Sequence, residues 1–596
     1  MANLIVLGIY LAVTLALGLY LSRYVRRDED FFLAGRSLNK WVVAGTVMAT
    51  NVAAIYLVGP AGKAYLSGVP VLLIAWTGNM IAAVSALFFV PRLRRLRITT
   101  VSEFLEARYG LWLRLLPTVL WIVYYALFAG NAIYTLAASL QPVLGLPIDT
   151  IIWFVGGAVV LYCFVAGLLA VVYTDVIQSF VILIGGLILL PLALKAVGGI
   201  SGFAARAPAG HFVFWKAGET WPTYKDVIMF TLLGLPYWCT SQYMLQRSFA
   251  GRSVRDASRG LMLAALLTGV LTLAYIVPGI CGSILYSGPE ALAKGAEDTV
   301  LPRLFVDILP VGLGGLFIAG LVAASNSTAS SLLNSLATLA EHDVYRRFLP
   351  RKGSRHYTWV GRAVTLAGGA VGLAFAFNVQ RLGGIIEANY TIMSFFEPPI
   401  FVIVAAALFW RGANAWGAAA AVVAGMAYSV VATFVVEPAV SPADRTFIAF
   451  PICIAALVVV SLAANAMRPA GAEARRKTEA LFSRMRPPRG GVMPAYAWAG
   501  LALAGAALVA FVACAFGEAA LPKPGNILIF LGLVTAFVLG CYLALPAFVP
   551  AEAEPDRQVE AGSIERSWIN RIVGSGWTWL GLYGAAAVLM FVLYFT

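Results

Sequence analysis

Long apolar runs alternate with short polar segments along the whole 596-residue chain. Each run holds about 20 residues, the length that an α-helix needs to cross the hydrocarbon core of a bilayer. The runs lack the ten-residue alternation that is typical of membrane-spanning strands. The pattern therefore predicts sixteen membrane-spanning helices, at residues 3–22, 41–60, 70–91, 115–141, 149–171, 174–199, 225–247, 257–286, 309–339, 358–380, 383–410, 413–436, 445–467, 492–516, 526–548 and 574–595.

One predicted span, 309–339, contains the polar stretch SNSTASSLLNS, which hydrocarbon alone cannot satisfy. On a helix, residues three and four positions apart share a face, so several hydroxyls fall on one stripe. The stripe consists of Ala324, Ser327, Thr328 and Ser331, with Ser330 beside it. Sodium, like other hard cations, prefers oxygen ligands, but small residues also let membrane helices pack closely. This stretch alone leaves ion binding and helix packing open.

Residues that break helices interrupt two of the predicted spans. They are Asn51 and Gly59-Pro60 in span 41–60, and Gly234 and Pro236 in span 225–247. A break persists in a membrane only where protein or water satisfies the freed backbone groups, so carbonyls near Ala49 and Val52 become candidate ion ligands. Two broken spans, five spans apart, indicate an inverted repeat of five plus five helices around a transporter's central site. A packing kink is the alternative for either span.

Aromatic, amide and hydroxyl side chains lie beside these breaks and in the third and eleventh spans. The candidates for solute binding are Asn51, Tyr56, Trp76, Tyr237, Trp238, Gln242, Asn389 and Tyr390. Rings stack on the apolar faces of sugars and amides bond their hydroxyls, so the set suits a sugar or a polyol. For any one aromatic residue, enrichment at the membrane interface is the alternative. We expect no Arg or Lys near the centre, which disfavours acidic solutes.

Charge follows the predicted topology. The chain is 61% hydrophobic and 12% charged, with a net charge of +14. Basic residues follow the first apolar run, so we expect no cleavable signal peptide and an external N-terminus. With alternating spans, most of the Lys and Arg fall in the cytoplasmic loops. Because the positive charge is divided among loops, it indicates membrane topology and no nucleic-acid partner.

Other functional classes find little support in the sequence. The six cysteines lie in apolar spans without a CxxC pair, and the three histidines lie outside the spans, so we expect no metal site other than sodium and no disulfide framework. There is no phosphate-binding glycine loop and no nucleophile elbow, so we expect no enzyme and no cofactor. A channel would need a charged or carbonyl ring, and a sensor would need a soluble output domain after residue 467.

Several motifs resemble one transporter family. They are DFFLAGRSLNKW before the second span, GLLAVVYTDVIQSF into the sixth, YWCTSQYMLQR in the seventh, NSTASSLLNSLATLAEHDVYRR in the ninth and FFEPPIFVIVAAALFW in the eleventh. Over about residues 1–460 the chain resembles the sodium/solute symporter family. The resemblance implies an all-α integral membrane protein with the LeuT-type five-plus-five inverted repeat, additional peripheral helices and solute uptake driven by the sodium gradient.

The resemblance also implies ion ligands. A first sodium ion would bind the carbonyls of Ala49, Val52 and Ala324 and the hydroxyls of Ser327 and Thr328. A second sodium, present in some members, would lie between Asp175 and the hydroxyls of Ser327, Ser330 and Ser331. The alternative role for Thr174-Asp175 is an N-cap of the sixth span.

The motif YWCTSQYMLQR is closest to the sugar-carrying branch of the family, although two positions depart from it. Thr268 stands where sugar carriers have a lysine ten residues before Pro278, and span 70–91 has no glutamate. We therefore expect sodium symport of a small polar solute, a sugar or polyol first. The alternatives are another small solute (an amino acid, a monocarboxylate or a vitamin-like compound) or a transporter-like sensor.

The expected organisation has five parts. These are an N-terminal helix with its loop at 1–40, a first repeat at 41–199, a second repeat at 225–410, two peripheral helices at 411–467 and an extension of about three helices at 468–596. We expect a multi-pass protein in the lipid bilayer of the plasma or inner cell membrane, functional as a monomer, with sodium and a small solute as its partners.

Overall fold

The computed structural model describes residues 2–22, 28–52, 54–214, 223–288, 292, 296–309, 313–382, 384–435, 440–469, 471–486, 494–516, 525–549 and 572–595. Within these residues the regular elements are helices. In the first half they are α1 (Ala2–Ser22), α2 (Asp28–Leu33), α3 (Lys40–Asn51), α4 (Ala54–Ser67), α5 (Pro70–Phe88), α6 (Val90–Arg95), α7 (Val101–Tyr109), α8 (Trp112–Leu144), α9 (Ile148–Ile151), α10 (Gly157–Ala196) and α11 (Gly199–Arg206).

The second half continues as helices. It contains α12 (Tyr224–Cys239), α13 (Gln242–Phe249), α14 (Val254–Leu271), α15 (Leu273–Leu285), α16 (Val300–Ile308), α17 (Leu313–Thr338), α18 (Arg346–Phe348), α19 (Ser354–Ala376), α20 (Ile385–Phe409), α21 (Ala415–Phe434), α22 (Pro442–Met467), α23 (Ala472–Met485), α24 (Ala495–Phe516), α25 (Gly525–Phe548) and α27 (Gly576–Phe595). A π-helical stretch, η6 (Leu339–Tyr345), joins α17 to α18, and another, η2 (Ile152–Gly156), joins α9 to α10.

Ten helices of the described chain are long and apolar enough to cross a membrane, and the bent pair α3–α4 raises the number to eleven. These eleven coincide with eleven of the sixteen predicted spans. The other five, 3–22, 149–171, 225–247, 309–339 and 574–595, contain helices that are broken, short or described only in part. Their crossing of the membrane stays a prediction.

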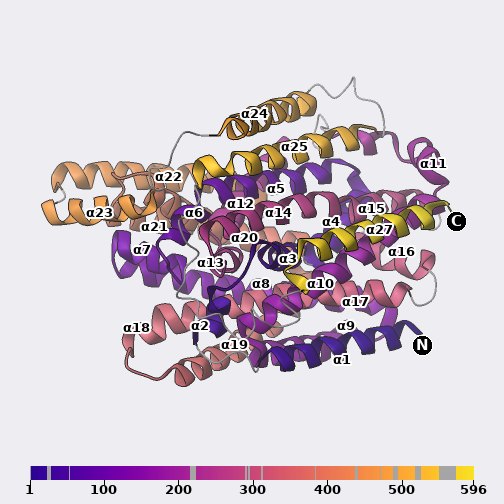
Figure 1. Cartoon of the computed structure of the whole chain (residues 1–596), viewed down its shortest axis with the longest axis horizontal. Coiled ribbons are helices and arrows are strands. Elements are labelled where there is room, and N and C mark those ends of the chain that lie inside the picture. The colour runs from indigo at the N-terminus through magenta and orange to yellow at the C-terminus, as the bar shows by residue number, and fades with distance from the viewer. Residues whose placement is uncertain are drawn as a thin grey trace.

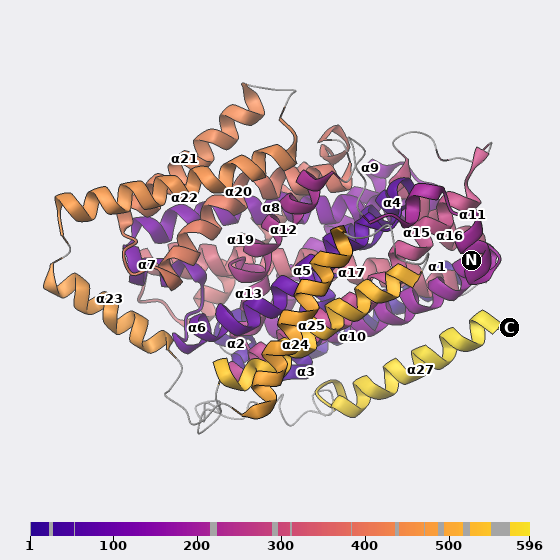
Figure 2. The same ribbon diagram turned by 90° about the horizontal axis from the view of Figure 1, so that it is seen from above.

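The helices run along the long axis of the molecule, and the connecting elements gather at its two ends (Figures 1 and 2). Helix α7 and the basic helix α23 lie at one end, whereas α11, α16 and both chain termini lie at the other. Elements that we expect on opposite sides of the membrane are therefore at opposite ends of the bundle.

The break in the second span falls directly after Asn51. Helix α3 ends there, α4 follows at an angle of 51°, and Val52 has non-helical dihedral angles. Gly59 and Pro60, which we expected to act as breakers, lie inside α4. A membrane helix can continue through a proline where other protein groups satisfy the carbonyl that the missing N–H leaves unpaired.

The break in the seventh span lies later than we expected. Helix α12 continues through Gly234 and Pro236 to Cys239, and the chain breaks at Thr240 and Ser241 before α13 begins. The backbone nitrogens of Thr240 and Ser241 both donate to the Pro236 carbonyl, at 3.0 and 2.9 Å. The helix therefore continues past Pro236 and ends where the Pro236 carbonyl accepts both of these hydrogen bonds.

The fifth and sixth predicted spans both fall within the continuous helical element that ends with α10, but they form two helices, Ile148–Phe164 and Val171–Ala196, as we expected. The hydroxyls of Tyr162 and Thr174 lie 2.7 Å apart within α10. Twelve residues of straight helix would separate the backbones of these two residues by about 18 Å, which is more than their side chains can bridge. The backbone of α10 must therefore fold back sharply between these residues, as two spans that cross in opposite directions require.

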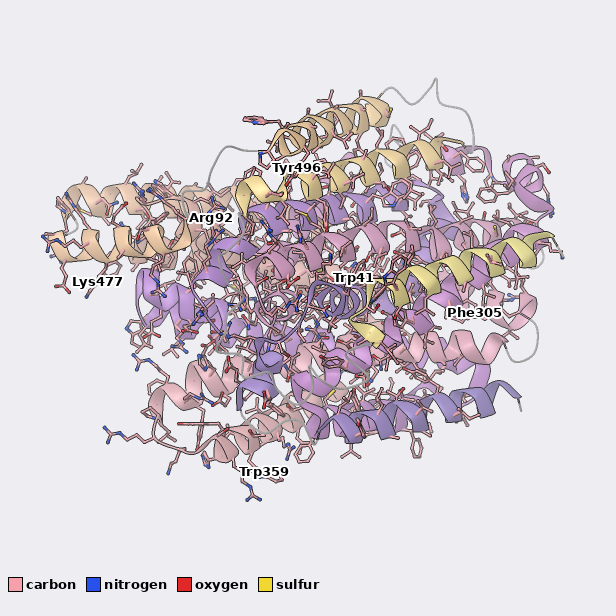
Figure 3. All side chains as sticks on the ribbon, in the orientation of Figure 1. Trp41, Arg92, Phe305, Trp359, Lys477 and Tyr496 are labelled. Carbon is pink, nitrogen blue, oxygen red and sulfur yellow. The ribbon has the colours of Figure 1, made fainter. Side chains whose placement is uncertain are left out.

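The helices after residue 490 pack on the outside of the core. Helices α24 and α25 contact each other, and α25 lies against α5 and α14. Helix α27 lies against α10, where the rings of Trp579 and Phe180 have centroids 4.5 Å apart. Trp579 also stacks on Trp41 of α3, which is labelled in Figure 3, with ring centroids 6.4 Å apart. This extension therefore covers two different faces of the core.

Candidate functional site

The hydroxyl stripe of α17 lies against the end of α3. The Thr328 hydroxyl lies 3.2 Å from the Thr50 carbonyl and 3.1 Å from the Ala324 carbonyl. The last carbonyls of a helix have no partner within it, so the end of α3, with Ala49 and Val52, offers free oxygens to this hydroxyl stripe. Ser327 is fully buried and its hydroxyl makes no hydrogen bond of ordinary geometry. These hard oxygens suit sodium.

The residues expected around a second sodium ion are also brought together. Asp175 is buried in α10, and its Oδ2 atom accepts a hydrogen bond from Thr46 at 2.8 Å. Ser331 lies 3.1 Å from the Thr50 hydroxyl. Ser330 is turned toward its own helix, because its hydroxyl donates to the Ser327 carbonyl at 3.0 Å. Asp175 lies inside α10 and bonds to other helices, so it is not the N-cap that we considered.

A buried arginine lies in the same place, against our expectation that no Arg or Lys would be near the centre. Arg247 is fully buried, its Nη2 atom lies 3.4 Å from Asp175 Oδ2, and it also donates to the Ser331 hydroxyl. Asp175 Oδ1 has no hydrogen-bond partner. A second sodium ion would therefore have to share Asp175 with a resident guanidinium.

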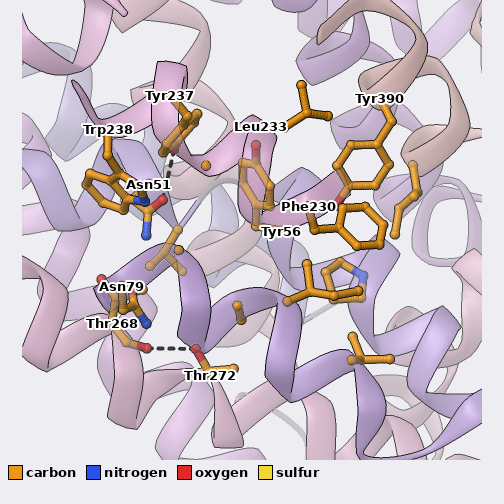
Figure 4. A pocket seen from close by; sticks show the side chains of 18 of the residues that line it. Asn51, Tyr56, Asn79, Phe230, Leu233, Tyr237, Trp238, Thr268, Thr272 and Tyr390 are labelled. Atoms are coloured by element: carbon orange, nitrogen blue, oxygen red, sulfur yellow. Dashed lines mark hydrogen bonds between the residues drawn. The ribbon is translucent and has the colours of Figure 1, made fainter. Parts of the chain in front are cut away.

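A cavity lies on the opposite side of the break (Figure 4). Five of the eight predicted solute-binding residues line it: Asn51, Tyr56, Tyr237, Trp238 and Tyr390. The Tyr237 hydroxyl donates to Asn51 Oδ1 at 2.8 Å and so ties α12 to the end of α3. Both broken helices thus contribute to one wall of the cavity.

The other three predicted solute-binding residues do not line the cavity. The Trp76 indole donates to the Gly269 carbonyl at 3.1 Å, and Gln242 bonds to the backbone of Thr99 and Val101. Asn389 is buried, with its amide nitrogen 3.5 Å from the Met393 sulfur. These side chains point into the protein, which the sequence could not show because the orientation of each helix about its axis was unknown.

Further lining residues are Asn79 of the third span and Phe230, Thr268, Thr272, Tyr275 and Met393, and sequence reasoning missed the last five as solute-binding candidates. Two of them present polar atoms without a hydrogen-bond partner, Asn79 Nδ2 and Thr268 Oγ1. Thr268 was visible as a departure from the sugar-carrying branch, so that comparison held a signal for the cavity. The lining contains no Arg, Lys, Asp or Glu among the described residues.

The outer end of the cavity carries a group of charged residues. Lys63 of α4 forms an ion pair with Glu387 of α20 at 2.6 Å. Asp298 lies beside them, with its Oδ2 atom 3.5 Å from the Ile385 nitrogen. Burial, assisted by the nearby charge of Glu387, raises the pKa of Asp298 to about 6.

Known proteins share this architecture. A sodium-coupled sialic acid symporter superposes with a TM-score of 0.71 at 23% identity, covering 78% of this chain and 98% of its own. A nucleobase-cation-symport-1 family transporter superposes with a TM-score of 0.52 at 14% identity, covering 76% of this chain and 98% of its own. These likenesses confirm the LeuT-type fold.

Sequence comparisons give the family. The sodium/glucose cotransporter of Vibrio parahaemolyticus is 29% identical over 466 residues, 72% of this chain and 85% of that protein. The sodium/myo-inositol cotransporter 2 of Homo sapiens is 28% identical over 468 residues, 72% of this chain and 69% of that protein. Both are transporters, which confirms the predicted class and the prediction of no enzyme. The model of the sodium:solute symporter family matches residues 31–425, and the chain belongs to that family.

Proposed function

We propose that this symporter carries an uncharged polyhydroxyl solute, a sugar or a polyol, into the cell together with sodium. The observation that carries the proposal is the position of the cavity directly beside the broken end of α3, whose other side meets the hydroxyls of α17. One segment of backbone thus contacts both proposed sites, so occupation of one site can change the other.

The chemistry of the cavity supports this solute class. Tyr56, Tyr237 and Trp238 offer aromatic faces, and Asn79 and Thr268 offer polar atoms without partners. Rings that stack on a sugar face and a few fixed polar groups are the usual means of binding such solutes. The names of the glucose and myo-inositol cotransporters agree with this class.

A carboxylate solute fits the cavity less well. Two basic groups lie near it, and both already have anionic or hydroxyl partners: Lys63 contacts Glu387, and Arg247 contacts Asp175 and Ser331. An anion in the cavity would have to be buried without a cation, which is costly.

Sodium enters the mechanism through differential affinity. We infer that the first ion binds the carbonyls of Ala49, Val52 and Ala324 and the hydroxyls of Ser327 and Thr328. An ion that contacts both α3 and α17 binds more tightly when these helices are close. It shifts the conformational equilibrium only by this difference in affinity between the two states. By linkage, sodium and solute then tighten each other's binding by the same factor. We propose a second ion at Asp175, and the number of sodium ions carried per solute tests it.

We propose that one chain contains the whole pathway, functions as a monomer and resides in the plasma or inner membrane. Uptake by proteoliposomes tests the function, using labelled D-glucose and myo-inositol with an inward gradient of sodium or of potassium. We expect uptake of one of them with sodium and none with potassium. Uptake of carboxylate solutes alone would contradict the solute class, and equal uptake in potassium would contradict the coupling.

A further inference from the structure

Four carboxyl side chains are fully buried in the described part of the chain, and three of them lie beside an arginine. These pairs are Asp175 with Arg247 at 3.4 Å, Glu341 with Arg346 at 2.8 Å and Asp343 with Arg114 at 2.7 Å. The fourth carboxyl is Glu397, and neither of its oxygens accepts a hydrogen bond of ordinary geometry. It differs from the others in having no cation to balance a charge.

Glu397 lies at the midpoint of the 25-residue helix α20, far from both ends of the span. An ionised carboxylate without a partner is very costly at such a depth, so the group is held as a neutral acid in this conformation. Ionisable residues inside a membrane protein are rare unless they serve a function, and proton transfer is one of the main ones. The position of Glu397 therefore needs a functional explanation.

Tyrosines from three helices face this carboxyl group. The hydroxyl of Tyr124 of α8 interacts with it at hydrogen-bonding range, and Tyr125 of α8, Tyr56 of α4 and Tyr237 of α12 lie close enough to interact with it electrostatically. Charged side chains on the elements packed against α20 have partners elsewhere. The pairs are Lys63 with Glu387, Lys225 with Asp444, Arg445 with Thr433, Arg114 with Asp343 and Glu106, Glu103 with His342, Asp226 with Thr223, Arg381 with Asn378, and Arg108 with the carbonyls of Trp410, Arg411 and Ala413. Phenol groups are thus the titratable neighbours of Glu397.

The carboxyl group lies directly behind the wall of the solute cavity. Tyr390, Met393 and Glu397 share one face of α20 by their spacing, and the first two line the cavity. Tyr56 and Tyr237 line the cavity and also interact electrostatically with Glu397. A movement that parts these rings would let water reach the carboxyl group. A glutamate in water ionises at neutral pH, because its ordinary pKa is about 4.3.

We propose that Glu397 is a proton-binding site coupled to the solute cavity: the carboxylate takes up one proton as the cavity closes, and the acid releases it when the cavity opens to water. This inference rests on the proposed function, because closure of the cavity is assumed to accompany solute transport. Sodium and a proton would then bind on opposite sides of the same break, sodium at α17 and the proton at α20.

Infrared spectroscopy of the purified full chain tests the protonation state without any solute. We expect the protein at pH 7 to show the C=O band of a protonated carboxyl, and Glu397→Gln to lose it. Glu473→Gln is the matched control, since Glu473 is exposed and forms an ion pair with Lys477. If the wild-type protein shows no such band at pH 7, or if Glu397→Gln retains it, the proposal is wrong. Absence of the band from the wild-type spectrum contradicts the proposal even if Glu397→Gln does not fold.

Transport measurements test the coupling. In proteoliposomes with a sodium gradient, we expect the half-saturation concentration for D-glucose or myo-inositol to rise with pH between 6 and 8. One linked proton sets the limit at about tenfold per pH unit. The Glu397→Gln variant should show sodium-dependent uptake that no longer changes with pH. Identical pH profiles in both proteins would overturn the coupling, whereas loss of sodium dependence in the wild-type protein would instead contradict the proposed function.

Discussion

The two sides of the break between α3 and α4 are built from different chemistry. On the α17 side, hydroxyls, Asp175 and Arg247 are buried and bonded to one another. On the cavity side, aromatic rings surround space, and Asn79 and Thr268 keep polar atoms without partners. A small ion needs several oxygens held at short range, whereas a larger solute needs room and a few orienting groups. The single break after α3 therefore contributes groups to both the ion side and the solute side.

The largest expected effect comes from removing the buried cation of the α17 side. Arg247→Met should destabilise the protein by about 3–5 kcal/mol, because Asp175 is left buried without a partner. Thermal unfolding in detergent measures the loss as a lower melting temperature. The double variant Asp175→Asn with Arg247→Met should recover most of the stability. A double variant as unstable as the single one would show that Arg247 acts through other contacts.

Sodium affinity should be the next most sensitive property. Thr328→Ala removes a hydroxyl that lies between the Thr50 and Ala324 carbonyls, and we expect the sodium concentration for half-maximal uptake to rise about tenfold. Ser327→Ala should act in the same direction, and solute affinity at saturating sodium should change less. Thr365→Ala is the control, because that buried hydroxyl bonds only to its own helix at 2.9 Å. An unchanged sodium dependence in both variants would refute this ion site.

The cavity side should respond in the opposite way. Tyr237→Phe removes the hydrogen bond to Asn51 and should weaken solute binding by about 1 kcal/mol, roughly fivefold, with a smaller change for sodium. Uptake measured against solute concentration at fixed sodium tests this. Tyr357→Phe loses a similar hydroxyl bond to the Leu349 carbonyl at the other end of the molecule and serves as the control. A larger change for sodium than for solute would erase the distinction between the two sides.

Much of the fold follows from simple regularities of the sequence. Apolar runs of bilayer length located the helices, and the basic loops predicted which elements gather at each end. The position of a break was harder to predict. Pro236 lies inside α12, and the chain turns only at Thr240, so the position of the proline does not give the position of the break.

The candidate site was harder to predict than the fold because it depends on three-dimensional orientation. Spacing placed Thr328 and Ser331 on one face, but nothing in the sequence shows that Trp76 and Gln242 turn away from the cavity. Arg247 was assigned to the end of a span, yet the break before α13 brings it inside, next to Asp175. Glu397 did carry a signal, since an acidic residue within an apolar span is functional by default.

The smallest expected effect lies at the outer end, where the cavity side meets solvent. Burial and the charge of Glu387 raise the pKa of Asp298 to about 6, above its ordinary value of about 3.9. The folded protein therefore binds more protons here than the unfolded chain between about pH 4 and pH 6, and this group's contribution to stability falls as pH rises through that window. Asparagine resembles the protonated acid, so Asp298→Asn should match the wild type at pH 4 and melt at a higher temperature above pH 6. Melting curves of both proteins across this range measure the difference. If the difference in melting temperature between the two proteins stays constant with pH, Asp298 is ionised throughout this range. Lys63 then balances the charges of both Asp298 and Glu387 at the mouth of the cavity.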